Sequence, residues 1–294
     1  MAMRPTTLLH PPLMTAFGGR PDRPDATPPV LVLPAMGVPA RRYGRLADAL
    51  SGQGLSGAVL EWPGTGSSPL RADRRHDWGY ADLLSHQLVP AIAALRGGAA
   101  AGPVLLLGHS LGGHLALMAR AAGAAGVGGI LLMSCGSPWR QTLAARERRQ
   151  LAVLCALVAV LTPLLGCFPG DRVGFGGRQP RRLMREWATF AARGQLPAGL
   201  LEPPTPAQAA AATAPRVKAL SLQGDVYAPA AATRHLLALA GVPDAQVDEV
   251  AGPGLSGHFD WLREPAPAAP RLARELRALS PRSRSDQGVG HEPS

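Results

Sequence analysis

The sequence predicts an α/β protein in which helices flank a mostly parallel sheet and a helical cap is inserted between two parts of the core. Short runs of branched apolar residues, such as Val30–Leu33 and Val104–Leu107, are typical of strands buried on both faces. Helical patterns alternate with these runs, which favours parallel strands joined by crossover helices. Between Ser137 and Pro215 the alternation stops, and this interruption indicates the insertion.

The first part of the core, residues 30–136, is predicted to repeat a strand and a helix three times and to end in a further strand. Pro39 suits the first turn of its helix, and Gly97 and Gly98 end another. The predicted strands are Val30–Leu33, Leu55–Leu60, Pro103–Leu107 and Gly129–Met133. The predicted helices are Pro39–Gln53, Trp78–Leu95 and Leu111–Ala122.

The insertion, residues 137–215, is predicted to be a helical cap or lid. Helical patterns cover Arg140–Cys167 and Arg181–Arg193, with a Gly- and Pro-rich loop at 169–180 between them and a Pro- and Ala-rich linker at 197–215 after them. The core resumes over residues 216–280. Its expected elements are the strands Val217–Gln223 and Gln246–Val250 and the helices Ala230–Ala240 and Ala268–Leu279.

The two ends of the chain carry weaker signals. Residues 1–29 are rich in proline, glycine and arginine, so we expect a poorly structured segment, with at most weak edge strands at Thr7–Leu9 and Met14–Phe17. The polar residues 281–294 are expected to form a disordered tail.

Composition limits the class of protein. The 294 residues carry a net charge of +10, but aromatic residues make up only 4% and do not interleave with basic ones, so we expect no nucleic-acid partner. Three cysteines form no C-x-x-C pair, which favours a reducing compartment, and no secretory segment is recognisable near Met1. We therefore expect a cytoplasmic monomer or homodimer that acts on a small molecule.

The segment Leu151–Phe168 is almost entirely apolar and reaches the lower limit of a membrane span. Pro163 and Gly166 interrupt its second half, and arginines flank it. We favour an apolar helix that covers an active site, without a membrane partner. A membrane hairpin is the alternative.

The most specific pattern lies at Gly108–Gly112, which matches Gly-x-Ser-x-Gly between a buried strand and a helix. In such a turn the central Ser110 adopts a strained, positive-φ conformation, so small residues must flank it. The turn presents the Ser110 hydroxyl at the carboxyl end of the sheet, beside the first N–H groups of a helix.

A serine nucleophile needs a base and an orienting carboxylate, and this turn requires them in the order Ser, acid, His. Asp225 directly follows a predicted strand, and His258 lies in a loop after the next one. Asp248 and Asp260 are weaker acid candidates.

The other histidines are assigned structural roles or excluded by order. His109 is expected to pack or to support the turn, and His114 to be structural, while His76 and His86 precede the nucleophile. No histidine spacing indicates a metal site, and no glycine motif indicates a dinucleotide, so no cofactor is expected.

Acyl transfer also needs two N–H donors for the substrate oxygen. We assign them to Leu111 and to Met36, which lies in the loop after Val30–Leu33. The candidates for the substrate pocket are Ala35, His109, Trp139 and Tyr227.

These motifs together resemble the α/β-hydrolase superfamily, and more narrowly the bacterial alpha/beta hydrolases related to the serine aminopeptidase and monoglyceride lipase group. The stretches that carry the resemblance are Pro34–Pro39 with Tyr43, Pro63–Ser68, Asp77–Gly79, Gly108–Gly113, Phe168–Gly170 and Gly257–Phe259. The resemblance implies a Ser110–Asp225–His258 triad, oxyanion donors at Met36 and Leu111, and a cap at residues 137–215.

Three departures from the family pattern are visible. Pro34-Ala35 stands where many relatives have His-Gly, and Glu61-Trp62-Pro63 replaces the commoner Asp-x-Arg. The N-terminal strands look eroded. None of these changes removes a member of the implied triad.

The sequence therefore predicts a serine hydrolase that cleaves a carboxylic ester, or less readily an amide, of small to medium size and partly apolar character. One alternative keeps the fold but cleaves C–C bonds or transfers acyl groups. The other is a non-catalytic binding protein or a membrane-associated one.

Overall fold

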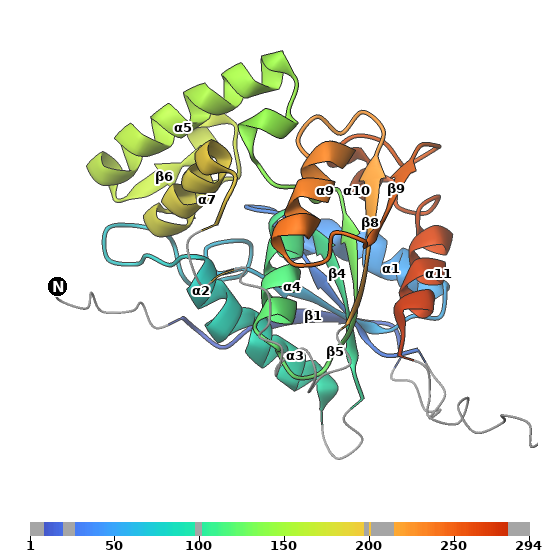
Figure 1. Cartoon of the computed structure of the whole chain (residues 1–294). Helices are drawn as coiled ribbons and strands as arrows, with labels where there is room; N and C mark the ends of the chain where they lie inside the picture. Colours follow the sequence, from blue (N-terminus) through green and yellow to red (C-terminus); the bar gives the residue numbers. More distant parts are fainter. Residues whose placement is uncertain (1–8, 20–26, 98–101, 197–199, 201–214, 282–294) are drawn as a thin grey trace, which may run out of the picture.

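The computed structural model describes residues 9–19, 27–97, 102–196, 200 and 215–281, and it contains one seven-stranded sheet and a cap (Figure 1). The sheet order is β1-β3-β2-β4-β5-β8-β9, and only the edge strand β1 runs antiparallel to its neighbour. The strands are β1 Leu13–Phe17, β2 Val30–Leu33, β3 Gly57–Glu61, β4 Val104–His109, β5 Val127–Met133, β8 Arg216–Leu222 and β9 Gln246–Val250.

Helices cover both faces of the sheet, so the central strands are buried on both sides. In β4, Leu106 belongs to the apolar cluster on the α4 side, whereas Leu105 and Leu107 belong to the cluster under α1 and α11. The core helices are η1 Ala40–Tyr43, α1 Gly44–Gly52, α2 Tyr80–Leu83, η2 Leu84–Leu88, α3 Val89–Arg96, α4 Leu111–Ala121, α9 Ala230–Leu239, α10 Asp260–Arg263 and α11 Ala269–Leu279. The predicted α/β class is confirmed.

The N-terminal segment and one helix differ in detail from the prediction. The edge strand expected at Met14–Phe17 is present as β1, which begins one residue earlier and pairs with β3 from Leu13 to Phe17, so this part of the segment 1–29 is structured. The helix predicted at Trp78–Leu95 begins at Tyr80 and changes to a π-helix at η2, just before Pro90, which has no N–H to donate. Leu9 lies outside any strand, and the rest of the Thr7–Leu9 segment is not among the described residues.

The cap is an α-helical hairpin joined by a short β-hairpin. Its elements are η3 Arg140–Thr142, α5 Ala145–Leu165, β6 Cys167–Pro169, α6 Gly170–Val173, β7 Arg178–Pro180 and α7 Arg181–Arg193. The predicted helix Arg181–Arg193 is confirmed, but the loop predicted at 169–180 is wrong, because β6 and β7 pair there with α6 between them. Most of the predicted linker 197–215 and of the tail 281–294 lies outside the described residues.

The cap helix α5 is unusual because it is apolar yet poorly covered. Among the described residues it is the one helix whose length and composition would suit a membrane span, but only 17% of its most apolar window is buried. Its inner side packs against α7, and Figure 1 shows both helices standing over the sheet.

The topology brings four strand ends to one edge of the sheet beneath the cap. Parallel pairing aligns the end of β2 with β4 through Leu33 and Gly108, and it aligns the end of β8 with β9 through Leu222 and Val250. Ligands in open parallel sheets bind beyond the carboxyl ends of the strands. The loops that follow these strands hold every residue predicted to take part in chemistry.

The close contact between α4 and β2 depends on Gly112, where a Cβ would overlap the carbonyl oxygen of Leu33. We expect Gly112→Ala to lower the free energy of unfolding by about 1–3 kcal/mol through overpacking. Gly44→Ala in α1 is the matched control, because a Cβ there meets nothing within 4 Å and should be neutral or stabilising. Urea denaturation of the two variants checks this, and equal effects would contradict it.

Candidate active site

Ser110 lies in the turn between β4 and α4 with φ 52° and ψ −116°. This conformation is strained for a residue with a side chain, and it confirms the predicted positive φ. Ser110 is partly exposed and lines a cavity of about 480 Å³ beneath the cap. Leu111 begins α4, so its backbone N–H belongs to the first turn, whose donors have no intrahelical acceptor.

Asp225 and His258, predicted in the loops after two successive strands, meet directly. The Nδ1 atom of His258 lies 3.0 Å and 2.9 Å from the two carboxylate oxygens of Asp225. The Asp225 side chain is fully buried, and that of His258 is 8% exposed. His258 also lines the cavity that contains Ser110.

The turn after β8 holds the Asp225 carboxylate before any ligand binds. Its Oδ1 atom accepts the backbone N–H groups of Tyr227 at 3.0 Å and Ala228 at 2.9 Å. These donors fix the carboxylate and stabilise its negative charge. The aspartate can therefore orient a proton at Nδ1 of His258 and leave Nε2 as the basic nitrogen.

His109 forms a second, buried link to His258. Its Nε2 atom donates to the backbone carbonyl of His258 at 3.0 Å, because a carbonyl can only accept, and its Nδ1 atom accepts the hydroxyl of Tyr43 at 2.7 Å. Burial, and then the nearby His258, hold the pKa of His109 well below its usual value, so the ring is neutral. The Indole N–H of Trp261 donates to the same His258 carbonyl at 3.1 Å.

The loop after β2 is fixed from two sides. The Tyr43 hydroxyl accepts the N–H of Ala35 at 2.8 Å, and the indole of Trp62 donates to the carbonyl of Pro34 at 2.8 Å. Glu61, which stands at the aspartate position of the commoner Asp-x-Arg pattern, is buried and accepts the N–H of Ala40 at 3.1 Å. These roles for Tyr43, Trp62 and Glu61 were not predicted, because each depends on a partner distant in the sequence.

The cap also touches this loop. Gly37 has φ +70°, and a Cβ there would overlap the backbone of Gly176 in the cap. Met36, the predicted donor, lines the cavity beside this contact. The position of the cap and the position of the Met36 backbone are therefore coupled.

The cavity is mainly apolar. Its lining comes from the loop after β2, the start of α4, α5, the β6–β7 loop and the loops that carry Tyr227 and His258. Representative residues are Ala35, Leu151, Leu154, Leu157, Phe175, Trp187 and Tyr227.

Two of the predicted pocket residues lie elsewhere. His109 is fully buried beneath His258, and Trp139 stacks on His235 with ring centroids 4.4 Å apart. Neither residue is part of the cavity lining. His109 packs in the core, as predicted, and its hydrogen bonds go to Tyr43 and to the His258 carbonyl, but its assignment to the pocket is wrong.

His114 on α4 combines a structural role with a place in the cavity lining. Its Nε2 atom donates to the carbonyl of Gly136 at 2.9 Å, and its Nδ1 atom accepts the hydroxyl of Tyr80 at 3.2 Å. Burial lowers the pKa of His114 to about 4. The ring is therefore neutral at pH 7.

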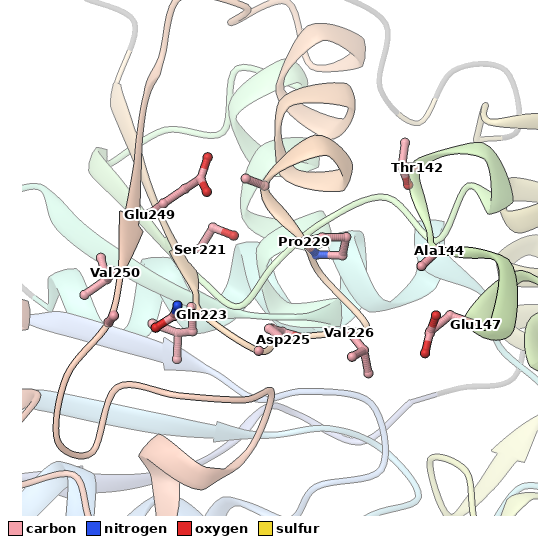
Figure 2. Close-up of a pocket in the computed structure, with 14 residues that line it drawn as sticks. Thr142, Ala144, Glu147, Ser221, Gln223, Asp225, Val226, Pro229, Glu249 and Val250 are labelled. Carbon is pink, nitrogen blue, oxygen red and sulfur yellow. The ribbon is translucent and has the colours of Figure 1, made fainter.

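A second cavity of about 610 Å³ lies on the other side of the Asp225 loop (Figure 2). Figure 2 shows Ser221, Gln223 and Glu249 from the two strands on one side and the start of the cap on the other. Glu147 and Val226 line both cavities. This second cavity contains neither Ser110 nor His258, so the cavity beneath the cap is the candidate active site.

The weaker acid candidates do not reach His258 in the structure. Asp248 pairs with Lys218 at 3.1 Å and with Arg271 at 2.6 Å, and Asp260 pairs with Arg263 at 3.3 Å. In the part of the chain that the structure describes, no three His, Cys, Asp or Glu side chains are grouped to hold a metal ion.

The neutral, buried His114 should make stability depend on pH. Unfolding restores its usual pKa, so between about pH 6.5 and 4 the unfolded chain binds a proton that the folded chain does not. We therefore expect protonation of His114 in the unfolded chain to lower the free energy of unfolding by about 3 kcal/mol as the pH falls from 7 to 4. Urea titrations across this range measure the loss.

His114→Gln should reduce this loss, and the exposed His86→Gln should not. An identical pH dependence in wild type and His114→Gln would rule out the assignment.

Comparison with known proteins places the chain in a family. Residues 30–274 match the model of the alpha/beta hydrolase family. No curated protein matches the sequence. Three solved structures resemble the fold: a monoacylglycerol lipase from Paleococcus ferrophilus, an esterase from Exiguobacterium antarcticum and a putative non-heme bromoperoxidase from Mycobacterium tuberculosis.

The similarity to these structures is extensive but distant. The lipase is 19% identical over 92% of this chain and 100% of its own, with a TM-score of 0.56. The esterase is 16% identical over 92% of this chain and 99% of its own, with a TM-score of 0.54. The bromoperoxidase is 13% identical over 95% of this chain and 100% of its own, with a TM-score of 0.60. At such identities the likeness shows the fold alone. The family match spans the cap and every strand of the sheet except β1, and the chain therefore belongs to the alpha/beta hydrolase family.

Proposed function

We propose that the protein is a serine hydrolase that cleaves carboxylic esters of small to medium size with a partly apolar acyl group. The observation that carries this proposal is the presence of Ser110 and His258 in one cavity, with the His258 ring held by the buried Asp225 carboxylate. The three residues also follow the chain order that a strand–turn–helix nucleophile requires.

In the proposed reaction, the Ser110 hydroxyl oxygen attacks the ester carbonyl carbon while Nε2 of His258 takes the hydroxyl proton. The ester C–O bond then breaks, and His258 returns the proton to the leaving alcohol. A water molecule attacks the acyl-enzyme with the same proton transfers, which releases the acid and restores Ser110. Asp225 stabilises the imidazolium that forms twice in each cycle.

Two backbone N–H groups would stabilise the negative charge on the substrate oxygen. Leu111 supplies one from the start of α4, and Met36 supplies the other from the loop after β2. Donors held rigidly before the reaction cost no reorganisation in the transition state. The hydrogen bonds from Trp62 and to Tyr43, which fix the neighbouring Pro34 and Ala35, support this role for Met36.

The lining of the cavity supports an apolar acyl group. Leu151, Leu154 and Leu157 of α5 and Phe175 and Trp187 of the cap face the space next to Ser110. Burial of an acyl chain there would contribute roughly 0.8 kcal/mol per CH₂ group. The names of two structural neighbours, a monoacylglycerol lipase and an esterase, agree with an ester substrate.

A fluorophosphonate probe tests the nucleophile. We expect labelling of the wild-type protein at Ser110, its loss in Ser110→Ala, and a fall in p-nitrophenyl ester hydrolysis on the order of 10⁴-fold in His258→Gln and Asp225→Asn. Intact-mass spectrometry and peptide mapping locate the label.

The exposed Ser85, whose change to alanine should affect nothing, is the control. Absence of labelling on a folded wild-type protein would refute the hydrolase, and labelling retained in Ser110→Ala would refute this nucleophile.

A panel of esters with increasing acyl length tests the pocket. Leu157→Trp fills part of the cavity, so kcat/KM for long acyl chains should fall by about tenfold or more while acetate is spared. Val160→Trp, one turn along α5 and outside the cavity lining, is the matched control. Equal losses on acetate and long chains would show that the acyl group binds elsewhere.

A further inference from the structure

From Leu151 onward, the outward side of the cap helix α5 carries only apolar side chains. Between Leu151 and Leu165 every exposed residue is apolar, and Val153, Val160 and Leu164 are 62%, 55% and 61% exposed. A helix on a water-exposed surface normally places polar residues there. Six of these exposed residues define the α5 stripe: Ala152, Val153, Ala156, Ala159, Val160 and Leu164.

The opposite side of α5 packs against the rest of the protein. Leu151 and Val158 are buried, and Leu154 and Leu157 pack against the apolar cluster that includes α7 and α4. Insertion of α5 across a membrane would remove this packing. The stripe therefore suits a surface on which the helix lies flat.

The α5 stripe continues into the mouth of the candidate active site. The structure describes nine exposed large apolar side chains, and five of them line the cavity of Ser110: Val153, Val173, Val226, Tyr227 and Phe259. Val153 belongs both to this rim and to the stripe. A contiguous apolar surface of this kind marks an interaction site.

Exposed arginines lie at the N-terminal end of the stripe and at the rim of the cavity. Residues 137–194 contain ten arginines and three acidic residues, which amounts to +7 of the net charge of +10 on the whole chain. Arg146, Arg148 and Arg149 are exposed in the first turns of α5, and Arg172 is exposed next to the rim residue Val173. An apolar face bordered at one end by arginines complements an anionic lipid surface.

We propose that the α5 stripe and its arginines bind the surface of an anionic lipid bilayer, with α5 in the plane of the interface and the cavity mouth facing the lipid. An apolar ester could then pass from the bilayer to Ser110 without crossing water, and this use of the surface rests on the proposed function. A second copy of the chain fits less well, because it would cover Val153 at the mouth and bring two sets of arginines together.

Vesicle binding by full-length Ser110→Ala protein tests the surface without any need for catalysis. We expect sedimentation with phosphatidylcholine vesicles that contain phosphatidylglycerol, much weaker sedimentation with phosphatidylcholine alone, and loss of binding as salt rises. Each of Arg148→Gln and Arg149→Gln should weaken partitioning about fivefold.

The double variant Val160→Asp/Leu164→Asp should weaken partitioning at least tenfold. Neither residue lines the cavity, so hydrolysis of a soluble short-chain ester should persist. Val89→Asp is the matched control, because Val89 is 39% exposed on α3, at the end of the molecule away from α5 (Figure 1). Circular dichroism checks that each variant is folded.

Absence of binding to anionic vesicles would overturn this proposal, and so would equal binding by the double variant and the wild-type protein. A third contrary result would be a concentration-dependent dimer that is lost in the double variant but kept in Val89→Asp. The last result would assign the stripe to a second copy. Vesicle binding without fluorophosphonate labelling at Ser110 would refute the proposed hydrolase and leave the lipid surface in place.

Discussion

The candidate active site depends on the way in which His258 is held. Its ring is bound by the buried Asp225 carboxylate, and its backbone carbonyl accepts two hydrogen bonds, from His109 and from Trp261. Asp225 follows β8 and His109 ends β4, whereas Trp261 lies on α10, three residues after His258. Two of the three partners therefore tie the position of His258 to the sheet and not only to the glycine-rich loop that carries it.

The same buried network joins the two sides of the site. His109 contacts the base loop through Nε2 and, through Tyr43, the loop that carries Ala35 and Met36. This arrangement works only while His109 is neutral, because a second proton would remove the acceptor at Nδ1. Complete burial keeps the ring neutral by making its charged form costly. His109, the residue before Ser110, thus connects the loop of His258 with the loop after β2.

The cap helix α5 has two different surfaces, because its inner side covers an apolar cavity and its outer side is exposed. Leu151 and Leu157 line the cavity and pack against the core, which accounts for part of the apolar sequence of α5. The exposed Val160 and Leu164 neither line the cavity nor pack in the core. The apolar run in the sequence therefore consists of residues that pack inward and residues that are exposed. Only the exposed residues require a partner outside the chain.

Local sequence determined the strands, the strained turn at Ser110 and the placement of Asp225 and His258, because buried strands, small flanking residues and strand ends leave signals over a few neighbouring positions. Only the tertiary structure decided the rest. Trp139 stacks on His235 and does not line the cavity of Ser110, β6 pairs with β7 inside an apparent loop, and Tyr43 contacts His109, 66 residues along the chain. Such contacts depend on which elements the fold brings together, and no local pattern encodes that choice.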